Sequence, residues 1–427
     1  MTYQESLDFL YRLQMFGIKL GLENIRTFLS RLGHPESRFK TILVAGTNGK
    51  GSTAAALAAI LNGSGYRTGL YTSPHLHSFC ERVQVDGSTI AEEDVVGLVA
   101  EMREKVGDLP LTFFEFTTAL ALQFFAEQEV DLAVVEVGLG GRLDATNAVK
   151  PILSVITPVA VDHEQYLGES LAQIACEKAG IMRTGVPVVI AGQQDDAKRA
   201  LQGEAKKVGA PLIAFHDDYN VDGYDETFDY RGLSRTLNGL RPGIPGRHQF
   251  GNMATALAAA EVLQQLGIDT TDRTMRSGIE QVSWPGRLEW LADGTVLLDG
   301  AHNGAGAVAL ARYLCDREMD KVHWVVGMKA DKDFEEILAP LASRAAALYC
   351  VAPPVEEAVP VASLCSAAEA LGLSAMACSS PEEALQKARA VAGDSGVVLV
   401  AGSLFLVAAI REILLREEGR WCDKSGL

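Results

Sequence analysis

The sequence predicts an α/β protein: an N-terminal P-loop-type domain on a mostly parallel sheet, plus a smaller C-terminal Rossmann-like α/β domain. Three observations lead to this prediction. Short apolar runs alternate with helical segments in two series along the 427 residues. A glycine-rich loop at residues 46–52 follows the first apolar run. A turn-rich stretch at Trp284 separates the two series and divides the chain into residues 1–287 and 288–427.

The N-terminal series begins with two short amphipathic helices within residues 1–40, broken at Gly17 and Gly21. Buried strands are then expected at 42–45, 131–137, 151–157 and 186–190. Helices are expected between and after them, at 54–61, 115–128, 170–181 and 195–208. Residues 216–246 interrupt this alternation with Asp, Gly, Tyr and Pro, which indicates a small β-ribbon or an extended loop.

The C-terminal series repeats the same alternation. Its strands are expected at 295–299, 321–326, 347–351 and 396–400. Its helices are expected at 304–315, 334–345, 381–392 and 404–415. Polar residues at the ends of such strands are where an open α/β sheet binds ligands.

The loop at 46–52 has the composition of a nucleotide-binding loop. Its glycines let successive backbone N–H groups converge on an anion, the following helix N-terminus adds partial positive charge, and Lys50 can reach the terminal phosphates. The match to the generic pattern is imperfect, because Val44 stands in place of a glycine and Gly51 in place of a hydroxyl. Ser52 or Thr53 would then supply that hydroxyl. The alternative is an ordinary strand-to-helix turn with a solvated lysine.

Bulk properties exclude several classes of protein. The formal charge of −17 and the lack of a basic run argue against a nucleic-acid partner. The seven cysteines are odd in number and form no Cys-x-x-Cys pair, which is typical of a reduced cytoplasmic protein. No signal peptide and no apolar stretch of membrane-spanning length is visible. We therefore expect a cytoplasmic protein without membrane contact, and a monomer.

Several ionisable residues lie in apolar surroundings near predicted strand ends. Glu136 lies inside an apolar strand, so its carboxylate must be paired, protonated or bound to a metal. Arg142 is one possible partner. With a phosphate loop nearby, the joint explanation is Mg²⁺ held by serine, glutamate and histidine side chains and bridging phosphate to an acceptor carboxylate. The run at 138–143 also imitates a dinucleotide fingerprint, but Leu143 replaces its third glycine, so a pyridine-nucleotide dehydrogenase is disfavoured.

Several strings together carry a family resemblance. They are Gly-Thr-Asn-Gly-Lys-Gly-Ser at 46–52, Tyr-Thr-Ser-Pro-His at 71–75, the glycine-rich run at 136–147, Asp162-His163, Glu-Lys-Ala-Gly at 177–180 and Asp-Gly-Ala-His-Asn at 299–303. In this order they resemble the dihydrofolate synthase/folylpolyglutamate synthase family of the Mur ligase superfamily, over residues from about 5 to about 415.

The resemblance implies an ATP- and Mg²⁺-dependent ligase. ATP would phosphorylate a substrate carboxylate, and the amine of L-glutamate would attack the acyl phosphate. The substrates would be dihydropteroate, giving dihydrofolate, and reduced folates, giving folylpolyglutamates. The alternatives are a folylpolyglutamate synthase without the first activity, or a Mur-type ligase acting on another carboxylate.

The resemblance also implies roles for individual residues. The ATP-binding residues would be Gly46, Thr47, Asn48, Gly49, Lys50, Gly51, Ser52, Asn252, Arg287, Asp299 and His302. Ser73, Glu136 and His163 would be Mg²⁺ ligands, with two metal sites possible, and Lys178 would be carbamylated. Lys50, Glu136, His163 and Lys178 would form the catalytic set. Thr112, Glu115, Leu143, Asp144 and Ala145 would line the folate pocket.

Structural alternatives stand beside some of these roles. Asn252 could be a plain helix N-cap, Arg287 a salt-bridge partner and Lys178 a helix lysine whose stem alone is buried. A cell-wall ligase is disfavoured, because about forty residues before the loop are too few for an extra domain. A nucleotide-binding switch without ligase activity would not need Glu136, His163 and Lys178 together.

Overall fold

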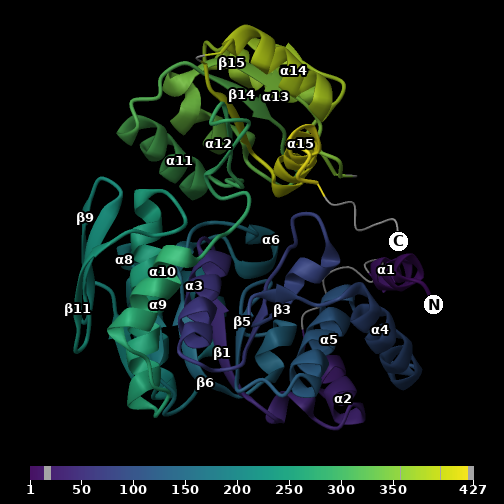
Figure 1. The fold of residues 1–427 in the computed structure, drawn as a ribbon, viewed down its shortest axis with the longest axis vertical. Helices are drawn as coiled ribbons and strands as arrows, with labels where there is room; N and C mark the ends of the chain where they lie inside the picture. Colours follow the sequence, from purple (N-terminus) through teal and green to yellow (C-terminus); the bar gives the residue numbers. More distant parts are fainter. Residues whose placement is uncertain (14–20, 356, 395, 422–427) are drawn as a thin grey trace. The chain divides into compact units, whose positions relative to one another are not determined.

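The computed structural model describes residues 1–13, 21–355, 357–394 and 396–421 (Figure 1). Two compact units divide the chain: Met1–Gly243 with Arg247–Ser283, and Ile244–Gly246 with Trp284–Leu427. The expected helix break at Gly17 lies outside the described residues. Within the described ranges, no helix combines the length and the apolar character that crossing a bilayer requires.

The first unit is built on an eight-stranded sheet. Six strands run parallel, in the spatial order β2 (Thr68–Tyr71), β5 (Leu132–Glu136), β1 (Lys40–Ala45), β6 (Pro151–Ile156), β7 (Val188–Ile190) and β8 (Leu212–Ala214). Two antiparallel strands, β3 (Val83–Val85) and β4 (Ser88–Thr89), extend the sheet beyond β2. β1 is therefore a central strand, with β5 and β6 as its neighbours.

The described residues of the first unit form ten α-helices beside this sheet. They are α1 (Tyr3–Arg12), α2 (Glu23–Arg31), α3 (Lys50–Gly63), α4 (Glu92–Val106), α5 (Phe113–Glu127), α6 (Glu164–Leu167), α7 (Leu171–Lys178), α8 (Asp195–Val208), α9 (Arg247–Gln265) and α10 (Asp272–Gln281). α3 follows the glycine-rich loop and buries mostly small residues, which lets neighbouring helices approach closely. On α10, a Cβ at Gly278 would lie 2.7 Å from the backbone nitrogen of Ile60, so only glycine fits at that crossing.

The second unit contains a six-stranded sheet. Its order is β12 (Glu289–Leu291), β13 (Val296–Leu298), β17 (Val398–Ala401), β14 (Val322–Val326), β15 (Ala345–Cys350) and β16 (Ala375–Ala377), with only β12 antiparallel to its neighbour. The α-helices are α11 (Gly304–Asp316), α12 (Phe334–Leu338), α13 (Val361–Ala370), α14 (Pro381–Ala392) and α15 (Leu404–Glu417). Trp324 of β14 is fully buried in the core.

The predicted fold class is confirmed, with differences in detail. The helix expected at 334–345 ends at Leu338 and continues as a 3₁₀ turn, because Pro340 lacks the N–H that an α-helix would use. The apolar pattern missed β2, α4 and α10, and it missed the whole α13–β16 unit. β2 and β16 are only four and three residues long, so their periodicity is weak. α4, by contrast, buries Val95, Leu98, Val99 and Met102 at helical spacing, which is a signal that the sequence does contain.

Residues 216–246, for which the sequence allowed a small β-ribbon or an extended loop, contain a β-ribbon. Three antiparallel strands make it up: β9 (Asn220–Tyr224), β10 (Thr227–Arg231) and β11 (Thr236–Leu240). The ribbon lies alongside α9 and α10 in Figure 1.

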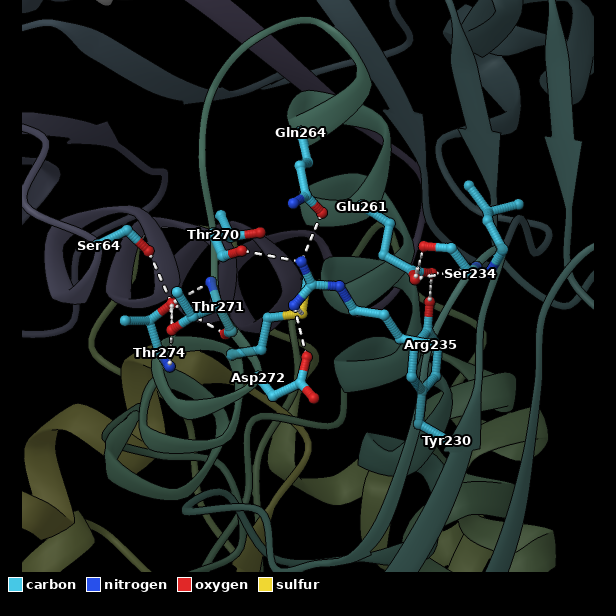
Figure 2. A network of polar contacts seen from close by, with 12 residues as sticks. Ser64, Tyr230, Ser234, Arg235, Glu261, Gln264, Thr270, Thr271, Asp272 and Thr274 are labelled. Atoms are coloured by element: carbon cyan, nitrogen blue, oxygen red, sulfur yellow. Dashed lines mark hydrogen bonds and ion pairs between the residues drawn. The ribbon is translucent and has the colours of Figure 1, made fainter.

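A buried carboxylate on α9 holds the ribbon to that helix (Figure 2). Glu261 is 1% exposed, and it accepts the Tyr230 hydroxyl at 2.9 Å and the Leu233 amide at 2.7 Å. The amide and the hydroxyl of Ser234 donate to its other oxygen at 3.2 and 3.1 Å. Four donors thus share one carboxylate, which satisfies the backbone of the turn between β10 and β11.

A neighbouring arginine adds contacts around the same turn. Arg235 donates to the Gln264 side chain, to the Thr270 carbonyl at 2.9 Å and to Asp272 at 2.6 Å, so it joins the turn to α9 and α10 (Figure 2). The two networks together fix the ribbon against the two helices.

We expect Glu261→Ala to lower the free energy of unfolding by about 2–3 kcal/mol, because the buried Tyr230 hydroxyl and the partly buried amides of Leu233 and Ser234 lose their acceptor. Urea denaturation measures this. Glu280→Ala on α10 is the matched control, since Glu280 makes a partly exposed pair with Arg276 at 3.2 Å and its loss should change stability by less than about 0.5 kcal/mol. Equal effects of the two substitutions would contradict a stabilising role for the network.

Candidate active site

The glycine-rich loop connects β1 to α3 and needs glycine at two positions. Gly46 and Gly49 have φ angles of 144° and 81°, which L-residues rarely adopt. A Cβ on Gly46 would lie 1.8 Å from the Thr157 hydroxyl oxygen, and one on Gly49 would lie 2.3 Å from the Asn252 side-chain oxygen. The loop therefore packs so closely against β6 and α9 that no side chain fits at either position.

Backbone hydrogen bonds hold the first half of the loop. The amides of Thr47 and Asn48 donate to the Pro158 carbonyl at 3.0 and 3.2 Å. The Thr47 hydroxyl donates to the Ala160 carbonyl at 3.0 Å and accepts the Ala160 amide at 3.1 Å. The amides of Lys50, Gly51 and Ser52 at the start of α3 have no acceptor within the helix and are available for an anion, whereas the Thr53 amide already donates to the Gly49 carbonyl at 2.9 Å.

Two lysines point their ammonium groups at carbonyls of this loop. Lys50 Nζ donates to the Thr47 carbonyl at 3.2 Å, and Lys178 Nζ donates to the Gly46 carbonyl at 2.8 Å. Lys178 comes from the end of α7 and is only 4% exposed. The snorkelling alternative for Lys178 is therefore wrong, because its charged end is inside the protein.

Burial has a large effect on the charge of Lys178. Desolvation and, secondarily, the nearby Lys50 ammonium lower the pKa of Lys178 to about 7, while Asp162 and Asp144 oppose the shift. A substantial fraction of Lys178 is consequently a neutral amine near pH 7. The neutral amine is the nucleophilic form of lysine.

Glu136 ends β5 beside the loop. Its carboxylate accepts the Ser73 amide at 3.1 Å through Oε2, and its Oε1 lies 4.0 Å from Lys50 Nζ. Arg142 is not its partner, since Arg142 pairs with Glu177 at 3.2 Å and with Glu204 at 3.9 Å. The structure thus brings Ser73, Glu136 and Lys50 together and corrects the ion pair that the sequence left open.

Of the three predicted metal ligands, Ser73 and Glu136 are in contact with each other, and His163 lies on a separate loop before α6. Ser73 and Glu136 are neighbours and offer oxygen donors, the kind that Mg²⁺ prefers. His163 precedes α6 with a left-handed φ of 54°, and its ring lies 3.9 Å from Asp162. Across the described ranges, no three His, Cys, Asp or Glu side chains are gathered closely enough to hold a metal. Phosphate oxygens and water would therefore have to complete the coordination of a metal at Glu136.

Two of the predicted folate-pocket residues form a helix cap. Thr112 is the N-cap of α5, and its hydroxyl accepts the Glu115 amide at 3.2 Å. The Glu115 carboxylate in turn accepts the Thr112 amide at 2.8 Å and the Thr112 hydroxyl at 2.9 Å. This capping box satisfies both side chains and fixes the start of α5.

The other three predicted folate-pocket residues follow the glycine run. Asp144 is buried, and it accepts the Leu139 amide at 2.8 Å and both donors of Thr146. Burial raises the pKa of Asp144, while these hydrogen bonds oppose that shift. Leu143 is 39% exposed and Ala145 is buried. Asp144 therefore shapes the loop after β5 and leaves Leu143 as the side chain presented outward.

The segment 71–75 also contains a histidine with an unexpected partner. His75 Nδ1 accepts a hydrogen bond from Arg82 Nε at 2.7 Å. Burial, and secondarily the Arg82 charge, lowers the pKa of His75 to about 3, so the ring is neutral. The sequence did not point to Arg82, because no local motif marks it and its role depends on its burial and its partner.

Three predicted nucleotide-binding residues lie in the second unit. The Asp299 carboxylate, which follows β13, accepts the Leu288 amide at 3.0 Å and the Ala301 amide at 2.9 Å. His302 Nδ1 lies 2.7 Å from the Gly300 carbonyl. A Cβ on Gly300 would lie 2.0 Å from Arg287, so these residues share one turn-rich site in that unit. Asn252 belongs to the first unit and sits inside α9, so it is not an N-cap.

Comparison with known proteins agrees with this arrangement. The Mur ligase middle domain matches residues 44–260, and the Mur ligase glutamate ligase domain matches residues 286–404. The fold and the phosphate loop thus define an ATP-dependent amide-bond ligase.

Relatives that match over almost their whole length identify the family within this class of ligases. A dihydrofolate synthase/folylpolyglutamate synthase of Bacillus subtilis (strain 168) is 35% identical over 97% of this chain and 99% of its own length. The structure of E. coli FolC in complex with DHPP and ADP is 33% identical and superposes with a TM-score of 0.89 over 97% of this chain and 98% of its own. A bifunctional folylpolyglutamate synthase/dihydrofolate synthase of Yersinia pestis, complexed with AMPPNP and Mn ion, is 35% identical with a TM-score of 0.88 over 97% and 98%. This chain belongs to the dihydrofolate synthase/folylpolyglutamate synthase family.

We expect Lys178→Met to stabilise the ligand-free protein at pH 6 by on the order of a few kcal/mol in CO₂-free buffer. Below pH 7 the lysine is charged in both states, so folding must desolvate the charge. Between pH 7 and 10.5 the folded form is neutral while the unfolded form is protonated, so wild-type stability rises with pH and the advantage of the variant shrinks.

Urea denaturation of wild type and variant from pH 6 to pH 10 measures this difference. Lys206→Met, at an exposed position of α8, is the matched control and should show no gain that depends on pH. A constant difference between Lys178→Met and wild type across this range would contradict a lowered pKa at Lys178.

Proposed function

We propose that this protein uses ATP to join L-glutamate to dihydropteroate, forming dihydrofolate, and to extend reduced folates to folylpolyglutamates. The observation that carries the proposal is the convergence of two lysines, the start of α3 and Glu136 on the glycine-rich loop after β1. This arrangement suits a polyphosphate beside a carboxylate that is being activated. The relatives named above for both activities support the choice of substrates.

The chemistry would proceed in two steps. The carboxylate oxygen of the pterin substrate attacks the γ-phosphorus of ATP, the bond to the β–γ bridging oxygen breaks, and ADP leaves. The amine of L-glutamate then attacks the acyl phosphate, and the tetrahedral intermediate collapses to an amide and inorganic phosphate. Lys50 and the first amides of α3 neutralise charge on the transferring phosphoryl group, and the loop fixes its position.

Glu136, Ser73 and His163 would hold Mg²⁺, with phosphate oxygens and water completing its coordination. A bound Mg²⁺ would supply further charge neutralisation at the phosphates. The proposal allows for two Mg²⁺ sites. The Mn ion in the Yersinia pestis relative supports the use of a divalent metal.

Lys178 is proposed to carry a carbamate in the active enzyme. Its lowered pKa favours the neutral amine, which is the form that reacts with CO₂. An unmodified ammonium so close to Lys50 would also repel a metal, whereas a carbamate would attract one.

The remaining predicted contacts belong to the same proposal. Asn252 would read the adenine, and Arg287, Asp299 and His302 would contact the nucleotide from the second unit. The pterin would lie near Leu143, Asp144 and Ala145, where the loop after β5 is held by Asp144. Thr112 and Glu115 would contribute by fixing the start of α5.

We expect Lys50→Ala to reduce phosphate release from ATP by on the order of 100-fold or more, because the transferring phosphoryl group loses its positioned cation. The assay contains ATP, Mg²⁺, L-glutamate and dihydropteroate. Thermal stability should change little, since Lys50 makes one backbone hydrogen bond and a long ion pair of 4.0 Å.

Lys206→Ala is the matched control, because it removes an exposed lysine elsewhere in the first unit and should leave phosphate release unchanged. Wild-type turnover in Lys50→Ala would exclude the glycine-rich loop as the phosphate site.

A further inference from the structure

One buried cation in the first unit, Arg82, forms no ion pair with the described residues. Arg82 ends the 3₁₀ turn Phe79–Arg82 and is 7% exposed. Its Nε donates to His75 Nδ1 at 2.7 Å, and its Cζ lies 5.2 Å from the centre of the Phe113 ring. Among the described residues, its two Nη groups make no hydrogen bond and no ion pair.

The two carboxylates whose charge reaches Arg82, Glu136 and Glu81, already accept other donors. Glu81 accepts the amides of Leu76, His77 and Ser78 at 2.7–3.0 Å. Glu136 accepts the Ser73 amide and lies near Lys50. The protein therefore holds a mostly buried guanidinium whose Nη groups have no protein acceptor among the described residues, which leaves them available to an anionic ligand.

His75 orients Arg82 without neutralising it. Because His75 Nδ1 accepts the hydrogen bond from Arg82 Nε at 2.7 Å, that nitrogen carries no proton and the ring is neutral. This hydrogen bond fixes the plane of the guanidinium and leaves the Nη pair for another group. A planar pair of N–H donors matches the two oxygens of a carboxylate.

The surroundings of Arg82 suit an aromatic acid. The Phe113 ring beneath the guanidinium stacks on Tyr11 at 5.8 Å and meets Phe79 edge-on at 6.4 Å. Two residues before His75, the Ser73 amide donates to Glu136, which is the carboxylate beside the phosphate loop. Arg82 is thus connected to an aromatic cluster on one side and to the phosphate-loop residues on the other.

We propose that Arg82 binds the carboxylate of the pterin substrate and holds it for attack on the phosphate. The inference rests on the proposed function, since it takes the substrate from there. Arg82 would offset the repulsion between the substrate carboxylate and the γ-phosphate, which matters in a protein with a formal charge of −17. The other anion that could reach a buried arginine is a nucleotide phosphate, and the experiment separates the two.

The test measures dissociation constants of dihydropteroate and of its neutral carboxamide, for wild type and for Arg82→Gln, together with that of Mg·ADP. Wild type should bind the carboxylate roughly 10- to 100-fold more tightly than the carboxamide, and the variant should lose this preference. Carboxamide and Mg·ADP affinities should stay within about twofold of wild type, because neither ligand uses the charge of Arg82. A merely structural role would weaken both pterin ligands equally and keep the preference.

Arg82→Lys keeps the buried charge and serves as the second variant if Arg82→Gln does not fold. It should retain part of the preference, since an ammonium cannot pair with both oxygens at once. An unchanged preference in the variants would overturn the proposal, and so would weakened Mg·ADP binding with an unchanged preference, which would assign Arg82 to the nucleotide. Binding of neither pterin ligand by wild type would instead contradict the proposed function itself.

Discussion

The site depends on one electrostatic constraint, which is the placement of two lysine amines at the carbonyls of a single loop. Lys50 and Lys178 come from different helices, yet their Nζ atoms lie 3.2 and 2.8 Å from the carbonyls of Thr47 and Gly46. Two cations held this close repel each other, and the lowered pKa of Lys178 is partly a consequence. A polyanion, or a carbamate on Lys178, would relieve the repulsion. The ligand-free site is therefore prepared for negative charge.

The sheet explains how residues distant in sequence reach this loop. β1 is central, β5 delivers Glu136 on one side, and β6 delivers Thr157 on the other. Parallel strands end at the same edge, so the residues that follow them become neighbours. The close contacts at Gly46 and Gly49 then fix the loop against β6 and α9. The central position of β1 and the close contacts at the two glycines together hold the loop in place.

Local patterns predicted the parts of this site that lie in one stretch of chain. The loop, the apolar strands and the buried carboxylate at Glu136 could all be found in this way, because their signals are composition and periodicity. The partners could not be found. Arg142 had seemed a natural partner for Glu136, but it pairs with Glu177, which lies 35 positions along the chain.

Arg82 and the capping box illustrate the same limit in two ways. Thr112 and Glu115 have the spacing of a capping box, and their hydrogen bonds satisfy each other, while their proposed place in the folate pocket stays a prediction. Arg82 has no motif at all, and its significance depends on burial and on the acceptors missing around it. Burial and pairing are tertiary properties, so they appear only once the chain is folded.

The most direct test of the proposed ligase activity is phosphate release from ATP and Mg²⁺ with L-glutamate, with dihydropteroate in one reaction and tetrahydrofolate in another. Release that requires L-glutamate in both reactions is the result expected for the two proposed activities. Release with tetrahydrofolate alone would restrict the enzyme to chain extension and contradict the pterin assignment at Leu143, Asp144 and Ala145. Release in neither reaction would contradict the proposed function.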